Sequence, residues 1–377
     1  MDIEYNFGVI KQLRKIDGIS QDEFAHKCQL SAQSMVAIEN DRTIPSLYNL
    51  RKVARVLNLS VEKLINIATK RQPMIIKPVY YLEECEFGFE YLIYTYRDSY
   101  IARRRATGQF NKYNSSITSS FGVAYYLLGG SVSIEENNNV HQVFTGDAIY
   151  YDAAGKADFS GQESGDALMV LSPKNNPIAR FLASHVRDEK IIDPDVCKAS
   201  FPKSNISFSV IRCLRKCRNK STADLCREIE LSYPALSSIE RNESIPTLPT
   251  VVKLARALGV SFFDLINFAE INPSHFFEKS VIETKQASGY ICRSAEREMT
   301  IYHRKAKNDI YVSQSDEIEH AGILTEFALA IKDSIEVEVN GEKFCLQQDE
   351  AIVFDALADH AYRLPSGGES IIIHTSF

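Results

Sequence analysis

Apolar residues in the first part of the chain recur at every third or fourth position. They are Ile10, Leu13, Phe24, Ala25, Leu30, Met35, Ile38, Leu50, Val53, Leu57, Leu64 and Ile65. This spacing places apolar side chains on one face of successive helices, and the breaks between them predict five short helices. Ser20 followed by Glu23 predicts a capping box at the start of the second helix, and Ser31 predicts the start of the third.

The same helical pattern returns about two hundred residues later. The stretch 28-CQLSAQSMVAIENDRTIP-45 has its counterpart in 229-IELSYPALSSIERNESIP-246. A shift of 201 residues superimposes Leu30 on Leu231, Ile38 on Ile239 and Glu39 on Glu240 without a gap. Self-similarity at a fixed shift indicates a duplicated unit, so we predict a second helical module of the same fold.

After each helical stretch the apolar period changes to two. The first such region contains 124-AYYLLGGSVSIEE-136 and 140-VHQVFTGDAIYYDA-153, and the second contains 327-FALAIKDSIEVEVNGEKFCL-346. Short alternating strands separated by turn residues predict a closed antiparallel barrel in each region. A shift of 203 residues places 148-AIYYDA-153 on 351-AIVFDA-356, so the duplication extends into the β regions.

These patterns predict an α+β multidomain chain in which two all-α modules alternate with two all-β modules. The predicted boundaries are 1–72 for the first helical module, 73–173 for the first barrel, 174–204 for a linker with a short helix, 205–272 for the second helical module and 273–377 for the second barrel. A length of 377 residues agrees with several cores rather than one.

Composition adds the expected compartment. No apolar run approaches the roughly 20 residues that cross a bilayer, and the first residues lack the order of a signal peptide. We therefore expect a cytoplasmic protein with no membrane partner.

Eight scattered cysteines are expected to be free thiols. The group Cys213, Cys217 and Cys226 resembles a metal or redox cluster, but the repeat places Cys217 and Cys226 at apolar core positions.

Charge is distributed unevenly along the chain. The net charge is −6, yet residues 5–70 carry ten Lys and Arg against six Asp and Glu, and residues 206–270 carry nine against seven. The rest of the chain is therefore strongly acidic. Basic modules on an acidic body are what local contact with phosphate requires, whereas coating of nucleic acid by the whole surface is excluded.

The first helical module resembles the XRE type of helix-turn-helix, the lambda-repressor-like fold, across 18-GISQDEFAHKCQLSAQSMVAIENDRTIPSLYNLRKVARVLNLSVEKLI-65. The resemblance implies double-stranded DNA as the partner. It places Gln21 near a phosphate, Arg42 on the backbone, and Gln33, Ser34 and Ala37, after Ser31, on the exposed face of the recognition helix. A Gln side chain on this face can read an adenine edge through two hydrogen bonds.

The second helical module keeps the core and changes the reading face. Thr222 stands where the first copy has Gln21, and Tyr233, Pro234 and Ala235 replace the start of the recognition helix. The residues predicted to contact DNA here are Ser237, Ser238, Arg241 and Asn242. Two arrangements stay open: the unequal pair reads an asymmetric site, or the first modules of a homodimer read a palindrome. In a third reading, either module serves only for packing.

The β regions resemble the cupin barrel, a double-stranded β-helix or jelly roll, on their turn positions and the segments DAIYYDA and DEAIVFDALADHAYRL. A metal-binding cupin holds its ion with His and Glu side chains. The first barrel has Ala157 at one such position. The second has His320, Glu326 and His360. We expect no cofactor, with Fe(II) in the second barrel as the alternative. Tyr94, Tyr96 and Arg97 form a candidate ligand site before the first barrel.

A helix-turn-helix followed by a cupin is a regulator architecture, so the resemblance favours a transcriptional regulator with a small-molecule effector over an enzyme. The same architecture occurs in non-haem iron oxygenases that act on phosphonates, of the hydroxyethylphosphonate dioxygenase and fosfomycin epoxidase type. The incomplete set of metal ligands argues against that alternative. A degenerate relative that binds neither DNA nor metal is the third interpretation.

Overall fold

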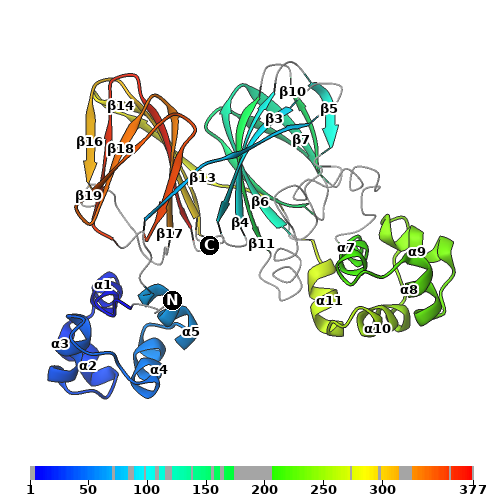
Figure 1. Ribbon diagram of the computed structural model, residues 1–377, viewed down its shortest axis with the longest axis horizontal. Helices are drawn as coiled ribbons and strands as arrows, with labels where there is room; N and C mark the ends of the chain where they lie inside the picture. Colours follow the sequence, from blue (N-terminus) through cyan, green and yellow to red (C-terminus); the bar gives the residue numbers. More distant parts are fainter. Residues whose placement is uncertain are drawn as a thin grey trace. The chain divides into compact units, whose positions relative to one another are not determined.

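The structure is a computed structural model of the chain. It describes residues 5–69, 73–83, 89–96, 99–106, 110–114, 121–136, 139–153, 157–161, 165–173, 206–271, 274–295, 299–313, 325–355 and 358–375. Figure 1 shows helical segments and antiparallel β-sheets, which agrees with the predicted α+β class. None of the described helices has the length and hydrophobicity that crossing a bilayer requires.

The chain forms two compact units, and neither is one continuous segment. The first unit comprises residues 1–75, 283–288 and 295–376, and the second comprises residues 76–282 and 289–294 together with residue 377. The first helical module therefore belongs to the same unit as most of the second β region. The second helical module belongs to the same unit as the first β region.

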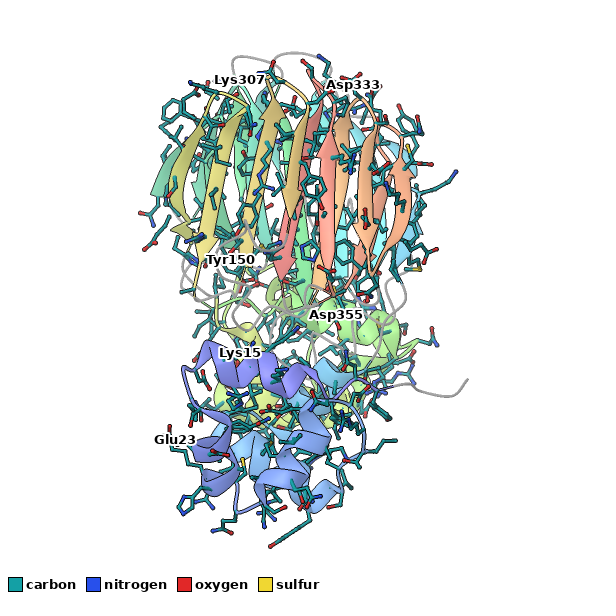
Figure 2. The ribbon with its side chains drawn as sticks, turned by 90° about the vertical axis from the view of Figure 1, so that its left-hand side faces the viewer. Lys15, Glu23, Tyr150, Lys307, Asp333 and Asp355 are labelled. Carbon is teal, nitrogen blue, oxygen red and sulfur yellow. The ribbon has the colours of Figure 1, made fainter. Side chains whose placement is uncertain are left out.

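The first helical module has the five helices that its periodicity predicts. They are α1 (Val9–Ile16), α2 (Gln21–Lys27), α3 (Ala32–Glu39), α4 (Leu47–Val56) and α5 (Val61–Ala68). The hydroxyl oxygens of Ser20 and Ser31 accept hydrogen bonds from the backbone N–H groups of Glu23 and Ser34, so both predicted helix starts are confirmed. Lys15 and Glu23 project from α1 and α2 into solvent (Figure 2).

The second helical module repeats this arrangement. Its helices are α7 (Val210–Cys217), α8 (Thr222–Ile229), α9 (Tyr233–Glu240), α10 (Leu248–Ala257) and α11 (Phe262–Ala269). Cys226 lies in the core, and Cys213 and Cys217 pack against it as free thiols. The prediction that Cys217 and Cys226 fill apolar positions is confirmed. Pro234 lies in the first turn of α9, where its missing N–H has no helical partner to lose.

Both helical modules are closed at their ends by the same backbone contacts. Tyr5 forms an isolated antiparallel bridge with Thr69, and Ile206 forms one with Glu270. The N–H groups of Asn6 and Ser207 donate to the carbonyl oxygens of Ala68 and Ala269 at 2.6 and 2.7 Å. The first and last residues of each module are thus adjacent, and its five helices enclose one apolar core.

The first β module consists of two antiparallel sheets. Its strands are β2 (Val79–Glu83), β3 (Phe89–Tyr96), β4 (Ser99–Ala106), β5 (Phe110–Asn114), β6 (Phe121–Gly129), β7 (Ser131–Glu136), β8 (Asn139–Phe144), β9 (Ala148–Asp152), β10 (Asp158–Gly161) and β11 (Asp166–Pro173). One sheet has the order β12-β9-β6-β11-β4-β3-β2 and the other β5-β10-β7-β8. Alternate residues of both sheets enclose a large aromatic and aliphatic core.

The second β module has the same two-sheet plan. Its strands are β13 (Glu278–Glu283), β14 (Ala287–Ser294), β15 (Met299–Ala306), β16 (Ile310–Ser313), β17 (Thr325–Lys332), β18 (Ile335–Val339), β19 (Glu342–Leu346), β20 (Ala351–Phe354), β21 (His360–Leu364) and β22 (Glu369–Thr375). The sheet orders are β1-β20-β17-β22-β15-β14-β13 and β16-β21-β18-β19. The predicted alternation of short antiparallel strands is present in both modules, as two facing sheets in each.

Two short strands that follow the helical modules lie at sheet edges. β1 (Met74–Ile76) lies next to β20, and β12 (His275–Phe276) pairs with β9, with His275 opposite Tyr150 and Phe276 opposite Ile149. The N–H of Phe277 continues the second pairing by donating to the carbonyl of Ala148 at 2.9 Å. Each of these strands therefore completes a sheet whose other edge strands lie far from it in sequence.

Candidate nucleic-acid interface

A buried ion pair joins the first and third helices of the first module. Arg14 on α1 donates from Nε and Nη2 to the two carboxylate oxygens of Glu39 on α3, at 2.6 and 3.0 Å. A third nitrogen, Nη1, donates to the carbonyl of Ile19 at 2.7 Å. The hydrogen bond to Glu39 raises the pKa of Arg14. Because paired guanidinium and carboxylate groups have one favoured geometry, this contact sets the position of α3 relative to α1.

The second module has the same pair. Nε and Nη2 of Arg215 donate to Glu240 at 2.7 and 2.9 Å, and Nη1 donates to the carbonyl of Lys220 at 3.1 Å. The hydrogen bond to Glu240 raises the pKa of Arg215. The sequence did not reveal this pair, although Glu39 and Glu240 superimpose in the repeat. The helical pattern does not distinguish a buried charged residue from an exposed polar one.

The polar face of α3 is exposed in the first module. Gln33 and Ser34 are exposed, Ala37 is half-buried, and Arg42 is exposed just after the helix. Ser31 is also exposed, and its hydroxyl lies 2.8 Å from that of Ser34 while it caps the helix. The residues predicted to face a groove are therefore on one accessible surface of this module.

Gln21, which the resemblance places near a phosphate, also makes a contact within the module. Its amide nitrogen donates to Oε2 of Glu39 at 2.6 Å, and the residue is half-buried at the start of α2. The side chain is thus joined to the Arg14–Glu39 pair that holds α3. Gln21 thus helps to orient α3, and the phosphate contact that the resemblance implies stays a prediction.

The reading face of the second module is less available. Arg241 donates to both carboxylate oxygens of Glu243, at 2.9 and 2.8 Å, and to the hydroxyl of Ser237 at 2.9 Å. Ser237 and Ser238 are half-buried, whereas Tyr233 is 61% exposed at the start of α9. Glu243 occupies the position of Arg42 in the first module. At this position the second module thus has a negative charge in place of a positive one, and that charge is paired with Arg241.

Asn242 holds the frame of its own module. Its side-chain oxygen accepts hydrogen bonds from the backbone N–H groups of Phe208 and Ser209, at 3.0 and 3.1 Å, just before α7. Asp41 does the same for Phe7 at 2.9 Å. Both residues have positive φ, 57° and 53°, which Asn and Asp tolerate better than most residues. The shared position of Asp41 and Asn242 in the repeat was the signal available in the sequence.

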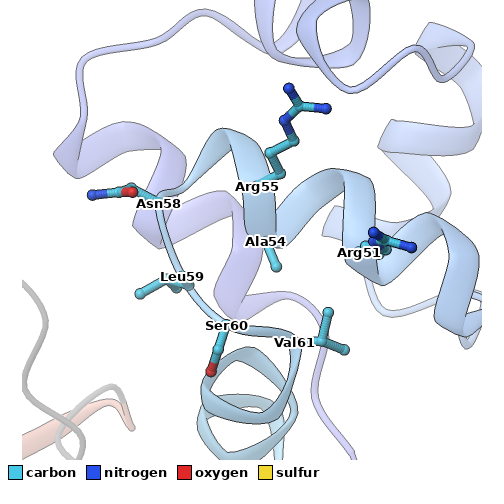
Figure 3. A pocket seen from close by; sticks show the side chains of 7 residues that line it. All are labelled: Arg51, Ala54, Arg55, Asn58, Leu59, Ser60 and Val61. Carbon is cyan, nitrogen blue, oxygen red and sulfur yellow. The ribbon is translucent and has the colours of Figure 1, made fainter.

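The segment after α3 and the helix α4 combine exposed apolar and basic groups. Ile44, Leu47 and Tyr48 are strongly exposed, and Nζ of Lys52 lies 4.6 Å from the centre of the Tyr48 ring. Arg51 and Arg55 project from α4 beside an open pocket of about 550 Å³ (Figure 3). The remaining lining residues are Ala54, Asn58, Leu59, Ser60 and Val61. This surface of the module is basic and lacks acidic lining residues.

The candidate ligand residues before the first barrel lie on β3. The core of the first β module includes Tyr91 and Ile93 but not Tyr94 or Tyr96, because alternate residues of a strand face opposite sides. Tyr94 is buried and Tyr96 half-buried on the side that faces away from this core. Arg97 lies outside the described residues, so the structure does not bring the three together.

The candidate metal ligands are only partly described. His320 lies outside the described residues, and Glu326 is placed by its backbone on β17, opposite Phe354 and His374. His360 is buried at the start of β21, and its Nδ1–H donates to the carbonyl of Ala358 at 2.7 Å. Among the described residues, no group of three His, Cys, Asp or Glu side chains is arranged to hold a metal ion.

Comparison with known proteins assigns the helical modules. Residues 10–64 and 211–265 both match the Helix-turn-helix family. The chain is also 28% identical over 169 residues to the HTH-type transcriptional regulator SutR of Escherichia coli (strain K12), an alignment that covers 44% of this chain and 89% of SutR. The Helix-turn-helix matches begin within the first helix and end within the fifth helix of each module.

Solved structures align over longer stretches at low similarity. Streptomyces albus HEPD, solved with 2-hydroxyethylphosphonate and Fe(II), is 11% identical with a TM-score of 0.42, covering 98% of this chain and 91% of that one. Bacillus subtilis oxalate decarboxylase is 11% identical with a TM-score of 0.44, covering 80% of this chain and 77% of that one. At these values neither alignment bears on the activity of the protein.

Proposed function

We propose that the protein is a sequence-specific DNA-binding transcriptional regulator and that its first helical module is the main reader. The proposal is carried by one observation: the polar face of α3, with Gln33, Ser34 and Arg42, is exposed on a helix that a buried ion pair holds in place. The match of both helical modules to the Helix-turn-helix family and the likeness to a transcriptional regulator support it.

In the proposed complex, α3 enters the major groove of a DNA duplex. The groove is about 12 Å wide and admits a helix with its side chains. Gln33 is proposed to read a base edge and Arg42 to contact a backbone phosphate, while the exposed α4 cations Arg51 and Arg55 add to the local positive potential. The acidic remainder of the chain favours approach of DNA through the helical modules rather than through the β modules.

The second helical module is proposed to contact DNA more weakly. Ser237 and Ser238 face the same side of α9 as the equivalent residues of α3, but Arg241 is held by Glu243. A single chain would therefore favour an asymmetric site with one strong and one weak half. A homodimer that pairs two first modules would instead favour a palindrome, and the symmetry of selected sites separates these two arrangements.

The test begins with selection of duplexes from a random pool by the full chain. Gel retardation of the best duplex is then compared between the wild type and the double variant Gln33→Ala/Arg42→Ala. Loss of a base contact costs about 1–3 kcal/mol, so affinity should fall at least about tenfold, and loss of one phosphate contact should lower the salt slope by about 0.9.

The matched control is Lys285→Ala/Gln286→Ala, which removes one cation and one amide from an exposed turn of the second β module. It should bind DNA as the wild type does. Unchanged binding of the Gln33/Arg42 variant, with loss in Ser237→Ala/Ser238→Ala, would transfer the reading role to the second module. Failure of every selected duplex to show salt-dependent retardation would contradict the proposal as a whole.

The cofactor is a separate question. We propose that the chain carries no metal cofactor, and elemental analysis of the purified full chain checks this. The alternative of Fe(II) in the second β module predicts about one iron per chain, reduced by His360→Ala. The helical modules and their regulator relative give that alternative no additional support.

A further inference from the structure

The two β modules have equivalent strand registers, so their interiors can be compared residue by residue. In the first, Arg104 on β4 is opposite Ala167 on β11, which is opposite Leu127 on β6. In the second, Arg304 on β15 is opposite Ser370 on β22, which is opposite Ala330 on β17. The N–H groups of Leu127 and Ala330 donate to the backbone carbonyls of Asp147 and Glu350, which lie in equivalent turns of the two modules.

The neighbouring rows correspond in the same way. Ala102, Met169, Tyr125 and Ile149 form one row in the first module, and Tyr302, Ile372, Ala328 and Ile352 form its counterpart. On the facing sheet, Phe159 lies opposite Ile134 and Tyr362 opposite Val337. Directly opposed residues of antiparallel strands point to the same side, so each row occupies one face of its sheet.

These rows face the space between the two sheets. In the first module their members belong to the enclosed core, with the ring of Phe159 on the facing sheet 5.3 Å from that of Tyr125. In the second module the ring of Phe354 on β20 lies 5.2 Å from that of His360 on β21 of the facing sheet. The ring of Tyr302 lies 4.9 Å from that of His374 on the same face.

The two interiors differ in polarity. In the first module, the positions Ala157, Phe159, Ala167 and Leu171 are apolar members of the core. The second module has His360, Tyr362, Ser370 and His374 at these positions, all of them buried. Four apolar groups of one interior are thus replaced by four groups that can form hydrogen bonds, although the surrounding strands and their registers are unchanged.

The two added hydroxyl groups have no hydrogen-bond partner in the part of the protein that the structure describes. The oxygens of Tyr362 and Ser370 are completely enclosed, and neither contacts a donor or acceptor among the described residues. A buried polar group without a partner costs about 1–3 kcal/mol. Such groups are rare in folded proteins and call for an explanation, of which a ligand that supplies the missing partner is one.

A cation lies on the strand next to one of these hydroxyl groups, that of Ser370. Arg104 in the first module donates to the hydroxyl of Tyr125 at 2.7 Å and lies 5.1 Å from the ring of Phe159. The second module keeps the arginine, as Arg304, and has Ala328 in place of Tyr125. Arg304 is opposite Ser370 in the sheet and lies 5.2 Å from the ring of Tyr302. Tyr362 occupies the position of Phe159.

We propose that the second β module binds a small organic acid, with its carboxylate between Arg304, Ser370 and Tyr362, and that the first β module does not. A guanidinium and two hydroxyl donors match a carboxylate, and the adjacent Tyr302, Ile372 and Phe354 match a carbon skeleton. Binding stands independently of DNA. The role of this acid as the effector rests on the proposed regulatory function.

The test uses the full chain without DNA. Small molecules are extracted from the purified protein and identified by mass spectrometry, and succinate, 2-oxoglutarate, citrate, glutamate and benzoate are titrated by calorimetry up to millimolar concentration. Succinamide and inorganic phosphate serve as the neutral and inorganic probes. At least one acid should be retained or bind, and succinamide should not.

Two variants give the second module the residue of the first. Ser370→Ala and Tyr362→Phe should each weaken acid binding at least about tenfold, the loss of about 1.4 kcal/mol expected when a charge-assisted hydrogen bond is removed. Removing an unpartnered hydroxyl should leave the unliganded variants as stable as the wild type, so lost binding will not reflect misfolding. Tyr311→Phe, which removes an exposed hydroxyl from the same module, is the matched control.

Four results would overturn the proposal: no acid retained or bound, binding unchanged in both variants, phosphate bound as tightly as the best acid, or one metal ion per chain at His360 in place of an acid. Retardation of DNA is measured separately with and without the acid. Loss of DNA binding contradicts the proposed function alone, whereas loss of acid binding contradicts the present inference alone.

Discussion

The two helical modules share a frame and differ on the surface that it presents. Arg14–Glu39 and Arg215–Glu240 join the first and third helices with nearly the same atoms and distances. After the third helix, however, the exposed Arg42 of one module is replaced by Glu243 of the other. The buried contact positions the helix in both modules, and the outer residues decide what that helix can bind.

The two β modules show the reverse distribution of change. On the face of the large sheet turned away from the interior rows, Arg103 pairs with Asp166 at 2.7 Å, and His303 at the equivalent position pairs with Glu369 at 2.6 Å. A polar side-chain pair is retained there although both residues differ, Arg and Asp in the first module and His and Glu in the second. The enclosed side is where polarity changed, from a core of apolar groups to one with several hydrogen-bonding groups. One pair of modules diverged on its outside and the other on its inside.

The largest expected effect comes from breaking the shared helical frame. Glu39→Ala leaves Arg14 buried without its carboxylate, which should lower the free energy of unfolding of the first helical module by about 3–5 kcal/mol. Glu240→Ala should cost less, because the Arg215–Glu240 pair is slightly more exposed. Hydrogen exchange of the amides in each module measures both losses.

The double variant Arg14→Met/Glu39→Leu is the control for this comparison. It removes both charges and keeps apolar volume, so its stability should lie close to that of the wild type. A double variant as unstable as Glu39→Ala would show that the pair contributes more than the avoidance of an unpaired charge, and the frame would then depend on the ion pair itself.

The next effect concerns the carboxyl group of Glu136 in the first β module. The second β module has Val339 at the equivalent position. Burial raises the pKa of Glu136 to about 7, and the charge of Asp152 adds to this, while a hydrogen bond with Ser274 opposes it. Ser274 also lies 2.9 Å from Nε2 of His141. The folded state therefore holds the proton of Glu136 more tightly than the unfolded chain does.

Stability from this group is present below about pH 4.5 and is lost as the pH rises through about 7. Glu136→Gln should therefore stabilise the first β module at pH 8, by up to about 3 kcal/mol, and have little effect at pH 4. Denaturant unfolding at both pH values measures the difference. An equal gain in stability from Glu136→Gln at both pH values would contradict the assignment.

A smaller effect tests whether Asn242 is structural. Asn242→Gly keeps the positive φ and removes the oxygen that accepts from Phe208 and Ser209, so stability of the second helical module should fall by about 1–2 kcal/mol. Affinity for the selected duplex should not change. A loss of DNA binding without loss of stability would return Asn242 to the DNA contacts that the family resemblance implied.

The smallest effect makes the two helical modules more alike. Glu243→Arg gives the second module the cation of the first and removes the carboxylate that holds Arg241. Affinity for DNA should rise several-fold, by less than about 1.4 kcal/mol, and the salt slope should steepen by about 0.9 for each phosphate gained. Gel retardation at several salt concentrations measures both. Unaltered affinity and slope would mean that the second module does not lie near DNA.

Much of the helical fold followed from the sequence because periodicity and caps act locally. Ser20 and Ser31 start their helices as predicted, and Cys226 occupies the apolar position that the repeat assigned to it. The roles of Glu39 and Asn242 did not follow, because each depends on a partner 25 to 34 residues away that periodicity does not specify. Polar residues on a recognition helix and polar residues that hold it have similar patterns.

The interior of the second β module was predictable only in part. His360 was assigned to the enclosed space through its alignment with Ala157. Ser370 and Tyr362 were not singled out, because alternation along a strand separates two faces without stating which one is enclosed. The decisive observation was the strand register, which the sequence does not contain. The predicted ligands His320 and Arg97 lie outside the described residues, so their roles remain predictions.

The edge strands β1 and β12 have a consequence for how such a chain arises and persists. Each follows a helical module of one repeat and completes a large sheet of the other, β1 beside β20 and β12 beside β9. A chain of residues 1–204 alone would have β9 without β12, and a chain of residues 205–377 alone would have β20 without β1. In each case one large sheet would lose its edge strand. We therefore expect each repeat to be less stable without the other, so that loss of either one is costlier than divergence by point substitution.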